Sequence, residues 1–213
     1  MTNSGEGEPD RRSERRPGTG GDSLVDEIPW KRALMYGIVA FAVGIVLVTG
    51  LVFIEGALDD SPDESGDVES DEDEPGVLTV MGWLYFSTQF VDIEASGAFG
   101  SETFDMLAFL TEDGSIPELV WRLAPVLALV AAGYLLASRE LDADATPEEG
   151  AKMGAYVTVG YLLAVVFGSQ LFTFTDTGAG ESVGVAFSQA VLLSGLLYPV
   201  LFGAIGGYLA FRT

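Results

Sequence analysis

The sequence predicts an all-α fold, a polytopic membrane protein with four transmembrane helices, an extracytoplasmic acidic loop and an interfacial helical cap. The chain of 213 residues is 48% hydrophobic, yet it carries 32 acidic against 10 basic residues, for a net charge of -22. Apolar and charged residues separate into alternating blocks, as in multi-pass membrane proteins. Several uncharged runs exceed the length of about 18 residues that indicates a membrane-spanning helix.

The first apolar block defines the first span. Residues 1–28 are polar with few apolar positions, which predicts a disordered cytoplasmic tail. Residues 29–55 form the first predicted transmembrane helix, in which 22 uncharged residues run from Ala33 to Ile54. At 1.5 Å per residue this run extends about 33 Å, enough to cross the hydrocarbon core. Trp30 marks its cytoplasmic interface.

Residues 56–116 are predicted to form an extracytoplasmic acidic loop. Within this loop, residues 76–91 are apolar and aromatic but too short for a straight span, which predicts an interfacial or re-entrant element. Its aromatic residues suit the headgroup region: Trp83, Tyr85, Phe86 and Phe90. A short helix is expected over residues 101–110, because Ser101 is a favourable N-cap.

The rest of the chain contains three further spans. Two start signals support their bounds: a capping box from Ser115 to Glu118, and Thr146 followed by Pro147 and acidic residues. The predicted segments are transmembrane helix 117–138, cytoplasmic loop 139–150, transmembrane helix 151–174, outer loop 175–182 and transmembrane helix 183–211.

The basic residues predict the orientation. With four spans and the N-terminus inside, nine of the ten basic residues lie on the cytoplasmic side, as the positive-inside rule requires. They are Arg11, Arg12, Arg15, Arg16, Lys31, Arg32, Arg139, Lys152 and Arg212. The sequence therefore predicts a multi-pass protein of the cell membrane with both termini in the cytoplasm.

Composition excludes several classes of function. The chain has no Cys and no His, which removes disulfides, thiolate nucleophiles, Cys or His metal sites and imidazole catalysis. The four span interiors carry no ionisable residue. We therefore expect no enzymatic activity, catalytic residue, cofactor or metal. The acidic balance disfavours nucleic-acid binding and is typical of halophilic proteins, whose stability depends on salt.

Topology gathers a few polar residues at one level of the membrane. Glu55, Arg122, Gln170 and Gln189 all lie toward the predicted outer ends of the helices, which suggests an outer polar collar. In this hypothesis Arg122 pairs with Glu55 or Glu118 and the glutamines bridge neighbouring helices. The alternative is that Arg122 snorkels to the interface and pairs with Glu118 on its own helix.

Small residues recur at one-turn spacing along the predicted spans. Gly37 and Gly44 in the first helix, and Gly203 and Gly207 in the fourth, allow helices to approach closely in lipid. Packing within the bundle is the favoured interpretation, and a dimerisation face is the alternative.

Two stretches resemble a family of small multi-spanning membrane proteins of halophilic archaea whose function is unassigned. They are Gly82-Trp83-Leu84-Tyr85-Phe86 with Phe90-Val91-Asp92, and Pro125 to Leu127 with Gly133-Tyr134. The resemblance implies a halophilic host and this architecture. Gln89 stands where that family tends to have a His, which argues against a metal or proton role at this position.

The leading hypothesis is a non-enzymatic membrane protein, an envelope or accessory component that acts as a scaffold. Its partners are the lipid bilayer and either another membrane protein or further copies of itself. The alternative is a small transporter or channel with a pathway near Pro125 and Pro199 and a site at the outer helix ends.

Overall fold

Four long helices dominate the computed structural model, which describes residues 29–56, 74–98, 100–112, 114–176 and 180–212. Each is long and apolar enough to cross a membrane, which confirms the predicted number of such helices. They are Trp30–Glu55, Glu118–Glu140, Pro147–Leu171 and Phe187–Ala210. The predicted N-terminal tail, with Arg11, Arg12, Arg15 and Arg16, and most of the acidic run after Gly56 lie outside the described residues.

Two of the long helices are interrupted. The third consists of α5 (Pro147–Ala155) and α6 (Thr158–Leu171). The fourth consists of α7 (Phe187–Gln189), the π-helix η1 (Ala190–Leu197) and α8 (Tyr198–Ala210). Pro199, in the first turn of α8, has no amide hydrogen for the helical ladder, and the amide of Tyr198 donates to the Leu193 carbonyl five residues back.

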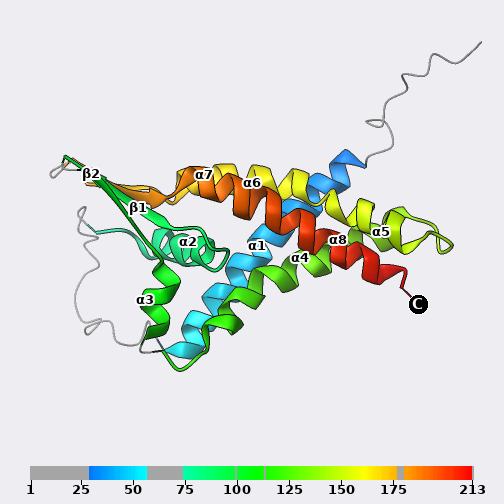
Figure 1. Cartoon of the computed structure of the whole chain (residues 1–213), viewed down its shortest axis with the longest axis horizontal. Coiled ribbons are helices and arrows are strands. Elements are labelled where there is room, and N and C mark those ends of the chain that lie inside the picture. Colours follow the sequence, from blue (N-terminus) through cyan, green and yellow to red (C-terminus); the bar gives the residue numbers. More distant parts are fainter. Residues whose placement is uncertain (1–28, 57–73, 99, 113, 177–179, 213) are drawn as a thin grey trace, which may run out of the picture.

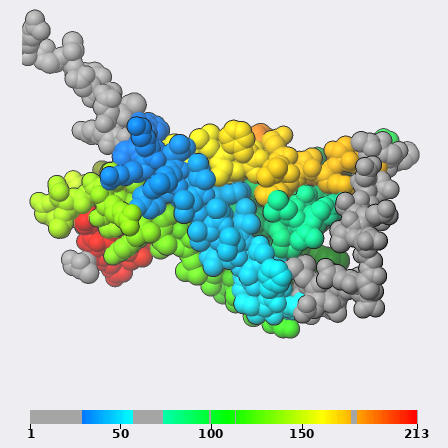
Figure 2. Space-filling model, turned by 180° about the vertical axis from the view of Figure 1, so that it is seen from behind, coloured from blue at the N-terminus to red at the C-terminus, as the bar shows by residue number. Residues whose placement is uncertain are grey.

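The helices form a bundle that opens toward one end (Figure 1). At the far end, where α1 (Trp30–Glu55) begins and α8 ends, α8 packs against α5 and α4 (Glu118–Glu140). Toward the sheet end, α1 and α4 diverge from α6 and α7. The short helix α2 (Val77–Ser87) lies between them, as the reverse view also shows (Figure 2).

Helix α2 is part of the protein core. All residues from Met81 to Gln89 are buried. This corrects the expectation that the aromatic side chains lie in the headgroup region, because Trp83, Tyr85 and Phe86 are at most 5% exposed and only Phe90 is exposed. A helix that is apolar on every side is stable where it is surrounded, and the diverging helices provide that space.

A four-stranded antiparallel sheet corrects the all-α prediction. Its order is β2 (Gly100–Phe104), β1 (Ile93–Gly97), β4 (Glu181–Val185) and β3 (Phe174–Asp176). The sheet replaces the predicted outer loop 175–182 and part of the predicted helix 101–110, which is instead β2 followed by α3 (Met106–Glu112). Pairing with β1 outweighs the local cap signal at Ser101, and Asp105 begins the helix by accepting from the amides of Leu107 and Ala108.

The two predicted helix starts have different outcomes. Thr146 forms a capping box with Glu149 at the start of α5, as its sequence indicates. The capping box predicted from Ser115 is wrong, because α4 begins at Glu118 after Pro117 and has no side-chain cap. The amide of Ser115 instead donates to Glu55 at the end of α1, so a contact between helices replaces the local one.

Glycines set the helix spacing away from the sheet. A Cβ atom on Gly37 would overlap the backbone of Val157 and Tyr161. A Cβ on Gly203 would lie 2.6 Å from the carbonyl oxygen of Gly154, and one on Gly207 would overlap Gly150. All three therefore lie where helix backbones meet directly. Gly44 differs, because its space is taken by the side chain of Tyr85 on α2.

Candidate functional site

The turn that follows α2 contacts several other elements at the end of the bundle that carries the sheet. The amide of Thr88 donates to Leu84 at 3.0 Å, and the amide of Val91 reaches back to Phe86 at 3.3 Å, so the chain reverses within a few residues. Phe90 adopts a φ of 61°, a conformation that costs free energy for an aromatic residue and persists only where surrounding contacts impose it. Residues 88–92, hereafter the α2 turn, make those contacts with four other elements.

Gln89 makes the first of these contacts. Its side chain is fully buried, and its Oε1 atom accepts hydrogen bonds from Tyr161 Oη on α6 at 2.8 Å and from Ser194 Oγ on η1 at 2.9 Å. The Tyr161 hydroxyl in turn lies 2.6 Å from that of Tyr85 on α2. These four side chains, the Gln89 network, join α2, α6 and the π-helix. Because buried polar groups are costly when unpaired, the network fixes the depth and rotation of α2.

Phe90 and Arg122 form the second contact. The Arg122 guanidinium lies 3.8 Å from the centre of the Phe90 ring, and Arg122 Nη1 donates to the Ser87 carbonyl at 3.0 Å. A cation at this position stabilises the C-terminal end of α2, where carbonyl groups lack helical partners. The unusual backbone at Phe90 thus places its ring against the Arg122 guanidinium, which also holds the end of the helix.

Arg122 also joins α3 and its own helix. Its Nε donates to Glu118 at 2.7 Å and its Nη2 lies 3.3 Å from Asp105 Oδ2. The side chain is only 12% exposed, so these ion pairs are screened less than surface pairs. The sequence offered Glu55 and Glu118 as alternative partners of Arg122. The structure pairs Arg122 with Glu118 and not with Glu55. Asp105, which caps α3, connects the arginine to the strand-to-helix corner.

Asp92 and Gln189 form the third contact. The amide of Asp92 donates to Gln189 Oε1 at 2.9 Å, and Gln189 Nε2 donates to Asp92 Oδ2 at 3.1 Å. The paired bonds align the start of β1 with α7, and the backbone bond from Ala186 to the Asp92 carbonyl extends the same junction. Val91, between these polar contacts, is buried in the core.

The other two predicted collar residues lie apart from this turn. Glu55 accepts from the backbone amides of Ser115 and Ile116, the latter at 2.9 Å, and so joins the end of α1 to the approach to α4. Gln170 is exposed on α6. The four predicted residues therefore do not form one collar. Arg122 and Gln189 each contact the α2 turn, and Glu55 separately joins the end of α1 to the segment before α4.

The side chains of the site hold segments of the chain in position. Gln89, Arg122, Gln189 and Glu55 each form a hydrogen bond with a distant segment of the chain. In the described part of the chain, no group of three or more His, Cys, Asp or Glu side chains is placed to hold a metal ion. What the arrangement does is fix one short helix and the sheet that follows it to the long helices.

Sequence reasoning missed the residues that meet Gln89 and Arg122 from a distance. Tyr161 and Ser194 lie in apolar spans where hydroxyl groups are common, and Asp105 was read as part of a helix. One signal was available: Gln89 is the only side-chain amide in the run GVLTVMGWLYFSTQFV. An isolated amide among apolar and aromatic residues requires a buried partner.

Comparison with known proteins identifies one family. The chain belongs to a family described as a family of unknown function (DUF7978), which matches residues 12–213. The match includes all four long helices, α2 and the sheet. No curated protein and no solved structure matches the chain.

Proposed function

We propose that this chain is a non-enzymatic integral membrane protein of a halophile, an envelope or accessory component that holds a small folded cap at the outer face of the membrane. The cap consists of the sheet and α3, and α2 joins it to the long helices. In this proposal the long helices span the cell membrane, both termini are cytoplasmic, and the cap presents a surface to a partner.

The anchoring of the α2 turn is the observation that carries the proposal. Three neighbouring residues, Gln89, Phe90 and Asp92, each contact a different part of the bundle through a side chain. A segment that had only to connect two spans would not need this set of contacts. A cap that must transmit or resist force from a partner would need them, because they fix its orientation relative to the long helices.

The distribution of basic residues supports the proposed orientation. Arg32, Arg139, Lys152 and Arg212 lie near the helix ends at the far end of the bundle, opposite the sheet. This end is the cytoplasmic one if the positive-inside rule applies. Arg122, at the sheet end, is the exception, and its pairing with Asp105 and Glu118 accounts for it.

Topology reporters test the membrane part of the proposal. A reporter fused near residue 65 should be accessible only from outside the cell, and one near residue 145 only from the cytoplasm. A third, after residue 212, serves as a cytoplasmic control. If the reporters at 65 and 145 are found on the same side, the four-span topology is wrong.

Purification in molar salt after crosslinking in intact cells tests the accessory part. We expect one protein to be recovered in constant ratio with the chain, and the recovery to fall when the cap is loosened by Arg122→Leu. Equal recovery from a variant with a loosened cap would contradict a role for the cap in binding.

A small transporter is the second candidate, and one observation favours it. The Gln89 network lies inside the bundle beside the π-helix η1, and π-helical turns are frequent at functional sites. Reconstitution into liposomes distinguishes the two candidates. Flux of a small solute that is lost in Ser194→Ala, while the fold is retained, would favour transport, and its absence in the native chain favours the accessory role.

A further inference from the structure

Strand β2 forms an edge of the sheet that is suited to pairing. It pairs with β1 along five consecutive residues without a bulge, and within the described ranges no strand pairs with its other side. All five residues of β2 are exposed. Proteins usually protect such edges with proline, charged side chains, bulges or very short strands. The opposite edge, β3, has only three residues, whereas β2 has five, with no proline or bulge and one charged residue, Glu102.

The charge of the sheet restricts what can pair there. The strands carry Glu94, Glu102, Asp176 and Glu181 and no basic residue. A second copy pairing symmetrically about the centre of β2 would bring the two Glu102 side chains opposite each other, which is unfavourable. The chain's own segment 57–73 has nine acidic and no basic residues and would be repelled as well. The sheet therefore favours a basic partner.

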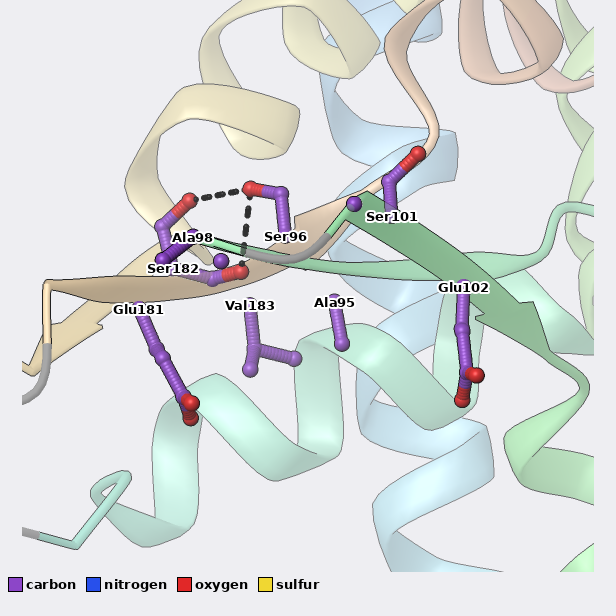
Figure 3. Close-up of a pocket in the computed structure, with 10 residues that line it drawn as sticks. Ala95, Ser96, Ala98, Ser101, Glu102, Glu181, Ser182 and Val183 are labelled. Atoms are coloured by element: carbon purple, nitrogen blue, oxygen red, sulfur yellow. Dashed lines mark hydrogen bonds between the residues drawn. The ribbon is translucent and has the colours of Figure 1, made fainter.

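A pocket at the sheet is lined by two glutamates that point to the same face, whereas its lining serines, Ser96, Ser101 and Ser182, point to the other face (Figure 3). It has a volume of about 310 Å³, and Glu102 and Glu181 stand at its two sides, pointing the same way as Ala95 between them. Gly97 and Gly100 also line it. Side chains alternate along a strand, so Gly100 leaves a gap beside Glu102 in the row that faces this side. A long side chain from a strand added about 4.8 Å beyond β2 can pass through that gap.

We propose that the open edge of β2 binds an extended basic segment of a partner protein by strand addition, with a Lys or Arg side chain of that segment between Glu102 and Glu181. Main-chain hydrogen bonds along the edge supply affinity, and the carboxylates select a basic sequence. This inference rests on the proposed accessory function and names the kind of partner that the cap would hold.

Peptide binding to the full chain in lipid nanodiscs tests this inference. The probe is the capped peptide Thr-Arg-Val-Arg-Val-Arg-Thr, whose arginines share one face. One matched peptide has Glu in place of Arg, and another keeps all side chains but is N-methylated at every peptide bond, so that it has no amide donor for a ladder. We expect saturable binding of the first peptide alone, and slower amide hydrogen exchange in residues 100–104.

Charge reversal at two positions provides the specificity test. Glu102→Lys should weaken binding of the Arg peptide about tenfold and should allow the Glu peptide to bind. Glu94→Lys is the matched control, because Glu94 lies on β1 with the same charge but faces the other side of the sheet. It should leave the preference for the Arg peptide unchanged. Retained resistance of the cap to protease shows that each variant is folded.

Three results would overturn the inference. They are equal weakening by Glu94→Lys and Glu102→Lys, equal binding of the N-methylated peptide, or binding without protection of residues 100–104. Each would show that the peptide binds through general charge attraction and not through strand pairing at β2. None would affect the anchoring of the cap, which the topology reporters and Arg122→Leu test separately, so failure of the edge and failure of the proposed function are distinguishable.

Discussion

The two halves of the bundle hold their helices together by different means. In the far half, glycines bring backbones into direct contact: Gly203 meets Gly154, and Gly207 meets Gly150. In the sheet half, hydrogen-bonding side chains join α2 to the surrounding helices. Close backbone packing is the main attraction available between helices in lipid, whereas a polar network also specifies orientation. Packing in the far half thus holds the helices close together, whereas hydrogen bonds in the sheet half fix the orientation of α2.

The comparison predicts opposite sensitivities to mutation. The far half should fail when one methyl group is added, because backbone atoms cannot move aside. The sheet half should fail when one hydrogen-bonding group is removed, because its partners stay buried. Four substitutions, in order of decreasing effect, test this difference.

The largest effect is expected for Gly37→Ala on α1. Its Cβ would overlap the backbone of Val157 and Tyr161, and we expect the free energy of unfolding to fall by about 3 kcal/mol. Thermal unfolding of the protein in nanodiscs measures the change. Gly50→Ala on the same helix is the matched control, because nothing lies within 4 Å of a Cβ there. It should be neutral or slightly stabilising, since Ala favours helix. Equal loss in the two variants would contradict the packing role of Gly37.

Gln89→Leu should have the next largest effect. It leaves the buried hydroxyls of Tyr161 and Ser194 without their acceptor, and we expect a loss of about 2 kcal/mol in the same unfolding measurement. Gln170→Leu, an exposed amide on α6, is the control and should change little.

A quadruple variant makes the Gln89 test sharper. Combining Gln89→Leu with Tyr85→Phe, Tyr161→Phe and Ser194→Ala removes every hydroxyl of the network, so part of the lost stability should return. If the quadruple variant is no more stable than Gln89→Leu alone, the effect is one of shape and the network does not act through its hydrogen bonds.

Arg122→Leu should loosen the cap while leaving the far half intact. It removes the donors to Ser87, Glu118 and Asp105, and we expect a local loss of about 1 to 2 kcal/mol. Limited proteolysis should cleave the segment 56–116 faster, with helix content unchanged. Arg122→Lys retains the charge without the planar set of donors and should give an intermediate rate. Unchanged cleavage in Arg122→Leu would show that the arginine does not hold the cap.

The sequence predicts the long helices well and the contacts between distant segments poorly. Long uncharged runs such as Ala33 to Ile54 identify helices because hydropathy is a local property. The sheet was missed because β1 and β4 have no clear alternation and pair although they lie about 90 residues apart in the sequence, Ile93 with Val185. The burial of α2 was missed for a related reason. The length of residues 76–91 argued for the interface, and only the divergence of α1 and α4 from α6 provides an interior place for the helix.

The candidate site shows the same limit. The pairing of Arg122 with Glu118, four residues apart on one helix, is visible in the sequence. Its bonds to Ser87 and Asp105, and the meeting of Gln89 with Ser194, depend on how separate elements pack. Predicting that polar residues share a level of the membrane did not predict which of them touch.

The smallest effect is expected for Glu55→Gln, at the sheet end of α1. The carboxylate accepts from two backbone amides, those of Ser115 and Ile116, and the neutral amide can replace only one acceptor with an oxygen. We expect a loss of about 0.5 to 1 kcal/mol, because the site is partly exposed and water can satisfy the second amide. Hydrogen exchange at residues 115–116 should rise, whereas exchange in α2 should not. If exchange in α2 rises equally, the Glu55 contact with Ser115 and Ile116 is coupled to the contacts that hold α2. Glu55 would then help to orient the cap.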